Sequence, residues 1–176
     1  MPTTINGTTG VSLVQDNVIT SLNQPSGSVI QVANFFTGEV ATGTTIIPLD
    51  DTIPQNTEGT QFMSLAFTPK KANSILKIEC IVNQAASLAD SMHVLALFRD
   101  STANAVGVSI AQGVSSAFNV NIKCTAFVSA GAITPTTFYV RTGGNAAGTI
   151  TFNGRSGARV YGGALASSIT ITEIVG

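Results

Sequence analysis

The chain has 176 residues, and only 10% of them are charged (8 Lys and Arg, 9 Asp and Glu), whereas an average soluble domain carries about 25%. The 44% of hydrophobic residues excludes an intrinsically disordered chain, and the longest apolar run, residues 94–98, is far shorter than the ~20 residues of a membrane-spanning helix. A net charge of −1 without a basic cluster offers no surface for nucleic acid or an anionic membrane. We therefore expect a folded chain that binds no nucleic acid and does not insert into membranes.

Residues 1–27 differ in composition from the rest of the chain, since they are rich in Thr, Asn and Gly and hold one charge, Asp16. An apolar stripe runs through them, at Val11, Leu13, Val14, Val18, Ile19 and Leu22. The spacing of three and four favours a helical turn or a short coiled-coil seam, while the β-branched residues keep extended pairing open. We predict that residues 1–27 are an anchoring and oligomerisation segment with subunit contacts at Val11, Val14, Val18 and Leu22. Residues 24–27 are the expected hinge after it.

From residue 28 onward, apolar and polar residues alternate almost everywhere, which is the pattern of half-buried β-strands. The expected strands lie at 28–36, 43–47, 61–67, 75–83, 92–98, 106–111, 118–128, 137–142, 149–153, 159–161 and 168–175. Short strands separated by Gly, Pro, Asn and Ser are typical of a sandwich or barrel. We predict an all-β fold, a jelly-roll-like antiparallel β-sandwich over residues 28–176, preceded by the short N-terminal anchoring segment.

The two cysteines, Cys80 and Cys124, both fall on the apolar side of alternating strands. The simplest interpretation is two buried free thiols. A disulfide would need their strands to be neighbours in matched register, which the sequence leaves open. Residues 1–30 hold no Lys or Arg, so we expect no secretory signal with a basic start and a reducing site of synthesis.

Few residues could carry catalysis. The one histidine, His93, lies on the face opposite Met92 and Val94, and we expect it at a surface or sheet face. Asp50, Asp51 and Glu58 flank a proline without the spacing of a calcium-binding loop, so a solvated acidic loop is the favoured interpretation. No nucleophile, metal or phosphate-binding motif occurs. We predict a protein that is not an enzyme and has no catalytic residue, metal or cofactor, although a site shared between subunits stays open.

Carbohydrate binding has no positive support in the composition. The chain has no Trp and two Tyr, and the loops at 84–91, 100–105, 112–117 and 143–148 lack aromatic side chains. Such loops favour a structural role over tight, specific recognition. Arg141, Arg155 and Arg159 are the main alternative, because they are three of the eight basic residues and lie close in sequence. They are either surface and subunit-contact positions or a patch for a receptor or other partner.

Several stretches resemble those of tailed-bacteriophage virion appendage proteins. The similar segments are the lead-in at 4–20, the short runs at 27–32, 67–69 and 74–78, and the closing stretches at 153–154, 158–163 and 167–174. The resemblance implies a homotrimer whose N-terminus joins other virion proteins and whose C-terminal β-sandwich forms a knob. Without an extended shaft, the chain fits a short tail fibre, spike or head fibre, with a capsid decoration (cement) protein or a receptor- or glycan-binding tip as alternatives. Its expected location is the virion, after synthesis in the host bacterial cytoplasm, and a host cell-surface receptor is a further expected partner.

The scarcity of charge also favours an assembly. Thr (23) and Ser (16) hydrate the outer faces of the strands without charge, but they leave apolar residues such as those of the N-terminal stripe uncovered. Burial between subunits would cover them. The composition and the resemblance therefore both favour a homotrimer.

Overall fold

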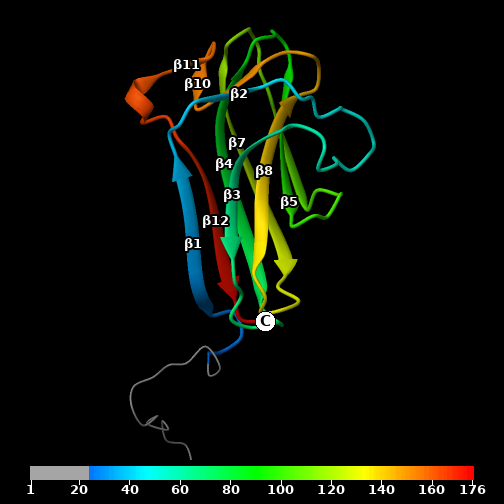
Figure 1. Cartoon of the computed structure of the whole chain (residues 1–176), viewed down its shortest axis with the longest axis vertical. Coiled ribbons are helices and arrows are strands. Elements are labelled where there is room, and N and C mark those ends of the chain that lie inside the picture. Colours follow the sequence, from blue (N-terminus) through cyan, green and yellow to red (C-terminus); the bar gives the residue numbers. More distant parts are fainter. Residues whose placement is uncertain (1–23) are drawn as a thin grey trace, which may run out of the picture.

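A computed structural model describes residues 24–176, which form two antiparallel sheets packed face to face (Figure 1). The first sheet contains β1 (Val29–Thr37), β12 (Ser167–Ile174), β4 (Ile75–Ala86), β7 (Asn119–Ser129), β9 (Ile150–Phe152) and β2 (Ala41–Gly43). The second sheet has the order β3 (Thr60–Phe67), β8 (Thr136–Gly144), β5 (Met92–Arg99) and β6 (Gly107–Gln112). The predicted all-β, jelly-roll-like antiparallel sandwich is confirmed.

The long strand β4 organises the first sheet. Its first half pairs with β12 and its last three residues pair with β9, while β7 pairs with almost its whole length. β12 and β9 therefore follow one another along the same edge of β4. On the outside, β1 pairs with β12 and β2 pairs with β9, so β1 is an edge strand of the sheet.

The main core lies between the two sheets and comes from the alternation that the sequence shows. The inward-facing side chains of β4, β7 and β12 meet those of β3, β5 and β8, and the set includes Leu76, Ile78, Cys80, Val82, Ile122, Cys124, Ile169, Ile171, Leu95, Leu97, Phe138, Val140 and Met63. Burying each large aliphatic or aromatic side chain contributes roughly 1.5–3 kcal/mol. This core is the principal source of stability in the sandwich.

A β-bulge in β3 adds a further aromatic side chain to this core. Gln61 pairs with Arg141 and Met63 pairs with Val140, so Phe62 has no opposite residue on β8. Its ring stacks on Phe152 of the first sheet, with 4.8 Å between the ring centroids and 3° between the planes. The bulge thus lets Phe62 join the two sheets while Gln61 points to the outer face.

The strand predicted at 43–47 is wrong for most of its length. β2 ends at Gly43, and residues 44–59 form a loop that covers part of the outer face of the second sheet (Figure 1). The β-branched residues of 44–47 look like a strand, but Ile47 donates only a single loop hydrogen bond, to Gly144, and Pro48 follows it. Ile47 is fully buried against Val94, Ala96 and Phe98, in a second and smaller apolar cluster.

β5 is therefore buried on both faces, and this overturns the expectation for His93. The face opposite Val94 is the main core and not solvent, so His93 is 1% exposed. The strand predicted at 118–128 begins one residue later than expected, and Phe118 is 46% exposed just before β7 begins.

The predicted strand at 159–161 is only partly correct. β10 (Gly154–Arg155) and β11 (Ala158–Arg159), strands of two residues each, form a hairpin. A short 3₁₀ turn, η1 (Tyr161–Gly163), follows the hairpin. Tyr161 and Gly162 both have positive φ, of 51° and 62°, which extended strands do not use. The other predicted strands agree with the observed ones to within a few residues.

Candidate functional site

A polar hollow of about 370 Å³ opens on the outer face of the second sheet. Its lining residues are Asn56, Gln61, Phe98, Asp100, Tyr139 and Arg141. Phe138 and Val140 face the main core, so the alternation of β8 points Tyr139 and Arg141 outward, toward the hollow. The register places Gln61 opposite Arg141 and Phe98 opposite Tyr139, and three strands therefore supply the base.

Arg141 ties this face of the sheet to the loop at 44–59. Its Nε donates to the Glu58 carbonyl oxygen at 2.8 Å, and its Nη2 donates to the Gly59 carbonyl oxygen at 2.9 Å. Arg141 forms no ion pair with any carboxylate of residues 24–176, and its Nη1 has no hydrogen-bond acceptor there. The guanidinium is thus fixed in place with one nitrogen left for a ligand.

The opposite end of the hollow carries Asp100, which is held by the sheet. Its Oδ1 accepts from the Thr137 backbone N–H at 2.8 Å, and its Oδ2 accepts from the Thr136 hydroxyl at 2.7 Å. Arg99 Nε lies 3.6 Å from the same Oδ2 and offsets the carboxylate charge. Arg141 lies opposite Ala96 of β5, and Asp100 follows Ala96 by four residues, just past the end of β5, so the Cα atoms at the two ends are roughly 13 Å apart.

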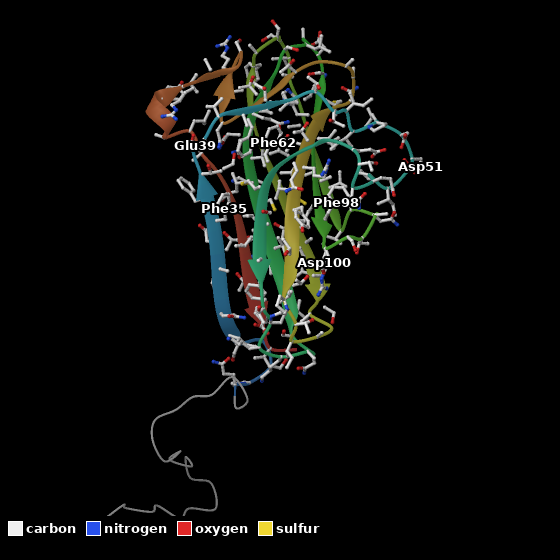
Figure 2. The ribbon with its side chains drawn as sticks, viewed as in Figure 1. Phe35, Glu39, Asp51, Phe62, Phe98 and Asp100 are labelled. Atoms are coloured by element: carbon white, nitrogen blue, oxygen red, sulfur yellow. The ribbon has the colours of Figure 1, made fainter. Side chains whose placement is uncertain are left out.

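Asn56 closes the loop side of the hollow. Its backbone N–H donates to the Ala103 carbonyl oxygen at 2.8 Å, and its side-chain nitrogen lies 3.3 Å from the Thr102 carbonyl oxygen. The side-chain oxygen of Asn56 and the hydroxyl of Tyr139 make no hydrogen bond within the described part of the chain. Figure 2 shows Phe98 and Asp100 on the same flank of the molecule as the loop that carries Asp51, away from Phe35 and Glu39.

The structure places the three predicted arginines on two different elements. Arg141 is half-buried in β8, whereas Arg155 and Arg159 are exposed on the β10–β11 hairpin. Arg159 Nη2 lies 3.7 Å from the Glu39 carboxylate, an exposed and hence weak ion pair. A partner patch formed by Arg155 and Arg159 stays a prediction, and Arg141 belongs to the hollow instead.

The predicted acidic residues make local contacts. The Asp50 carboxylate caps a turn by accepting from the backbone N–H and hydroxyl of Thr52, and these hydrogen bonds lower its pKa. Glu58 accepts from the Gln55 backbone N–H at 3.0 Å, and Asp51 is exposed. Within residues 24–176, no group of three His, Cys, Asp or Glu side chains converges as metal ligands.

His93 takes part in a buried polar contact that bridges the sandwich. Its Nδ1 lies 3.2 Å from the side-chain nitrogen of Gln84, which comes from the first sheet. Burial lowers the pKa of His93, because the charged imidazolium would lose its hydration. The neutral ring and the Gln84 side chain share a hydrogen bond across the sandwich, which stabilises the fold.

Cys80 and Cys124 are free, buried and directly opposite one another on β4 and β7, so the interpretation as buried thiols is confirmed. Burial, together with the neighbouring Cys124, raises the pKa of Cys80, and burial likewise raises the pKa of Cys124. Thiols held in the protonated form are poor nucleophiles and poor metal ligands. Both side chains therefore act as core residues.

A buried carboxylate that was not predicted from the sequence, Glu173, lies at the end of β12. It is fully buried and accepts hydrogen bonds from the backbone N–H groups of Lys70 and Lys71, from the Ser74 hydroxyl and from the Gln31 amide. Burial raises its pKa, but the hydrogen bonds outweigh burial, and the net pKa lies below the usual value. Glu173 follows Ile169 and Ile171 at the alternate positions of β12 that face inward, and this alternation is the sequence feature that indicates its burial.

Two apolar surfaces lie at opposite edges of the sandwich. On the edge strand β1, Val32 is 58% and Phe36 is 66% exposed, on a strand with one free edge. We call this surface, together with the exposed Val29, the β1 surface. On the edge strand β6 of the other sheet, Val108 and Ile110 form the β6 surface, with Ile110 50% exposed.

The predicted subunit contacts Val11, Val14, Val18 and Leu22 lie outside the described residues. No helix in residues 24–176 is both long and apolar enough to cross a membrane.

Comparison with known families identifies the sandwich. Residues 30–176 match the family model described as the Pgp3 C-terminal domain, over most of the chain. The chain belongs to this family. The Pgp3 C-terminal domain model covers the whole of β12 and all but the first residue of β1, and so includes every strand that lines the hollow.

Membership in the Pgp3 C-terminal domain family corrects two expectations. The resemblance to tailed-bacteriophage appendage proteins is wrong, because the family is that of a chlamydial protein. The expected location in a virion made in a bacterial host is wrong for the same reason. The Thr- and Gly-rich lead-in and the alternating closing strands are features that many antiparallel β-proteins share, so they did not distinguish one family from another.

Among solved structures, the chain is similar to two of infectious bursal disease virus. The structure of the Gx strain is 13% identical with a TM-score of 0.39, and the match covers 86% of this chain and 38% of that one. The VP2 subviral particle is 12% identical with a TM-score of 0.34, covering 85% and 38%. The chain thus spans well under half the length of these viral chains. No curated protein matches the sequence.

Proposed function

We propose that this Pgp3 C-terminal domain family member is a non-enzymatic structural domain that assembles with copies of itself into a homotrimer. The observation that carries the proposal is the pair of apolar surfaces at opposite edges of the sandwich, the β1 surface and the β6 surface. In a closed ring, the β1 surface of each subunit contacts the β6 surface of its neighbour. Such a contact between two different surfaces is called heterologous. Such a ring would cover side chains that a monomer leaves in water.

The low charge of these surfaces supports the same proposal. The residues of β1, Val29–Thr37, and of β6, Gly107–Gln112, include no charged side chain. Charged residues are depleted at the centre of subunit interfaces, because their desolvation is costly. A free edge strand without charge or proline also needs protection from uncontrolled pairing, which an ordered interface provides.

A structural role also agrees with how the fold uses its titratable groups. Glu173, His93 and Asp100 each make hydrogen bonds that hold separate segments together. A general acid or base needs a free position next to a reacting group. These residues instead stabilise the scaffold.

The test is the molecular mass in solution, by size-exclusion chromatography with light scattering. We expect a mass three times the 18.0 kDa of the chain at micromolar concentration. Phe36→Asp and Ile110→Asp should each dissociate the assembly, because each places a charge in the proposed contact. Ile133→Asp is the matched control, since Ile133 is 62% exposed on a turn outside both surfaces.

The outcomes separate the models. A stable 18.0 kDa mass for the parent chain contradicts the proposal. A dimer that Phe36→Asp dissociates and Ile110→Asp leaves intact would mean a symmetric β1–β1 contact, and would replace the ring.

A further inference from the structure

Beyond this assembly role, we propose that the hollow on the outer face of the second sheet is a binding site for a small acidic saccharide. The carboxylate of the sugar would bind at Arg141, and its hydroxyl groups would bind Gln61, Asn56 and Tyr139, which lie between Arg141 and the more distant Asp100. A volume of about 370 Å³ lies at the small end of the range for ligand pockets and fits a ligand of monosaccharide size.

The charge distribution requires an anionic group at one end of the ligand only. Arg141 is positioned by two backbone carbonyl groups and has no carboxylate partner in the part of the chain that the structure describes. Asp100 is already offset by Arg99 and accepts two hydrogen bonds. The uncompensated charge of the hollow is therefore the guanidinium, which pairs well with a planar carboxylate.

The remaining polar side chains of the hollow favour a ligand that carries hydroxyl groups. Arg141 only donates, and Asn56 can only accept, because its side-chain nitrogen already donates to the Ser101 and Thr102 carbonyl groups, whereas Tyr139 and Gln61 can each do both. A ligand that satisfies all of them must donate and accept at several points, as a sugar does. A simple anion such as phosphate or acetate would occupy Arg141 alone, and a second negative charge near Asp100 would be repelled.

One wall of the hollow fits the apolar part of a sugar ring. Tyr139 and Phe98 are opposite one another on β8 and β5, and because Phe98 is only 1% exposed, Tyr139 presents the accessible ring. The negative face of an aromatic ring attracts the polarised C–H groups of a saccharide. The Tyr139 hydroxyl, which has no hydrogen-bond partner within residues 24–176, provides a polar contact beside that apolar surface.

The experiment is a titration of the isotope-labelled full chain, followed by ¹H–¹⁵N NMR. The ligands are N-acetylneuraminic acid and glucuronic acid, with glucose as the neutral sugar and acetate as the isolated carboxylate. We expect saturable shifts for the amides of Asn56, Gln61 and Arg141 with at least one acidic sugar. Glucose and acetate should each bind about tenfold more weakly, because each lacks one half of the recognition. The shifts report on the hollow in any oligomeric state, so this test is independent of the homotrimer.

Matched variants locate the site. Tyr139→Phe keeps the ring and removes only the hydroxyl, and it should weaken binding about fivefold. Arg141→Gln should weaken it about tenfold or more. Because Arg141 also holds the loop at 44–59, Gln61→Ala provides a second, mild variant at an exposed position, with an expected loss of about threefold. The controls are Tyr161→Phe, at the other tyrosine of the chain, and Arg155→Gln, at an exposed hairpin arginine, and both should bind as the parent does.

Three results would overturn the proposal. One is the absence of saturable shifts with both acidic sugars. Another is equal affinity for glucose or acetate, which would mean that the carboxylate or the hydroxyl groups are not recognised. The third is equal weakening by Tyr161→Phe or Arg155→Gln, which would place the binding outside the hollow.

Discussion

The Glu173 carboxylate holds together three parts of the chain that are far apart in sequence. It accepts from Gln31 on β1 and from the turn at 70–74, while its own backbone belongs to β12. A buried charge is tolerated only when it is fully hydrogen-bonded, and here each carboxylate oxygen has at least two donors. The end of the sandwich is therefore closed by one side chain.

We expect Glu173→Gln to destabilise the domain by about 1.5–3 kcal/mol at neutral pH, because an amide nitrogen would face donors that now bind a carboxylate. The pKa of Glu173 is lower in the folded chain than its usual value of 4.5, so its contribution is complete above pH 4.5. That contribution is lost as pH falls through the lower folded pKa. Urea unfolding of the parent and the variant at several pH values measures this, and the two curves should converge in acid.

Glu79→Gln is the control for this prediction. Glu79 lies on the outer face of β4 and pairs with Lys77 at 2.9 Å, with 44% of its side chain exposed. A surface pair contributes little, so the free energy of unfolding should change by less than about 1 kcal/mol. An equal loss in both variants would contradict a special role for Glu173.

We expect protonation of His93 to lower the free energy of unfolding as well, at a higher pH than protonation of Glu173 does. Burial lowers the pKa of His93 from 6.5 in the folded chain, so the unfolded chain binds the proton more readily. The contribution of His93 to the free energy of unfolding should be constant above pH 6.5 and fall as pH drops below it. In His93→Gln this particular slope should disappear, while the acid dependence from Glu173 remains. A slope near pH 6 that survives in His93→Gln would assign it to another group.

Single residues differ in how well the sequence predicts them. The alternation of β4 and β7 correctly placed Cys80 and Cys124 inside, because a half-buried strand has one inward face. The same rule failed for His93, because both faces of β5 are covered. It also places Glu173 on the inward face of β12, but the donors that make a buried carboxylate possible are brought together only in the folded chain.

At the scale of elements, the loop at 44–59 depends on a close approach between two backbones. A Cβ at Gly143 would lie 2.7 Å from the Thr45 carbonyl oxygen and 3.0 Å from the Ile47 nitrogen. Gly143→Ala should therefore push the loop off the second sheet and destabilise the domain by about 1–3 kcal/mol. Limited proteolysis should show faster cleavage within 44–59.

The matched control for Gly143→Ala is Gly131→Ser. Gly131 has a φ of 74° but open space around it, so the strain of a side chain there is confined to its own turn. Cleavage within 44–59 should keep the parent rate in that variant. An unchanged rate in Gly143→Ala would mean that the loop is not held by this contact.

The elements themselves were largely predictable, because each strand alternates apolar and polar residues along its own length. β7 and β12 are the clearest examples, with their inward side chains at every second position. The loop at 44–59 was not predictable, since its Ile47 is buried by β5 and β8 and not by a regular pairing. The bulge that turns Gln61 outward also has no pattern in the sequence.

For the whole molecule, the proposed homotrimer predicts that thermal stability depends on concentration. Because association stabilises only the folded chain, a tenfold rise in concentration should raise the Tm by about a few degrees. Phe36→Asp should remove this dependence. Differential scanning calorimetry over a concentration series measures both, and a constant Tm for the parent chain would contradict self-association.

The hollow is a property of the whole molecule, which explains why sequence analysis did not find it. Its residues come from a loop, three strands and a strand end, between positions 56 and 141. Sequence proximity grouped Arg141 with Arg155 and Arg159, whereas folding brings it to Asn56 and Gln61. The absence of aromatic residues from the exposed loops also concealed Tyr139, which reaches the surface from within a strand.

The pairing of β1 with β12 has a consequence for the synthesis of the protein. β12 lies between β1 and β4, so the first strand of the domain has no place in the sheet until the last one has been made. Asn34 and Thr170, whose side chains are hydrogen-bonded across this pair, are 136 positions apart. On the ribosome, an apolar and uncharged β1 must therefore wait uncovered while nearly all of the domain is translated. The nascent chain is a natural client for a chaperone that binds extended apolar segments.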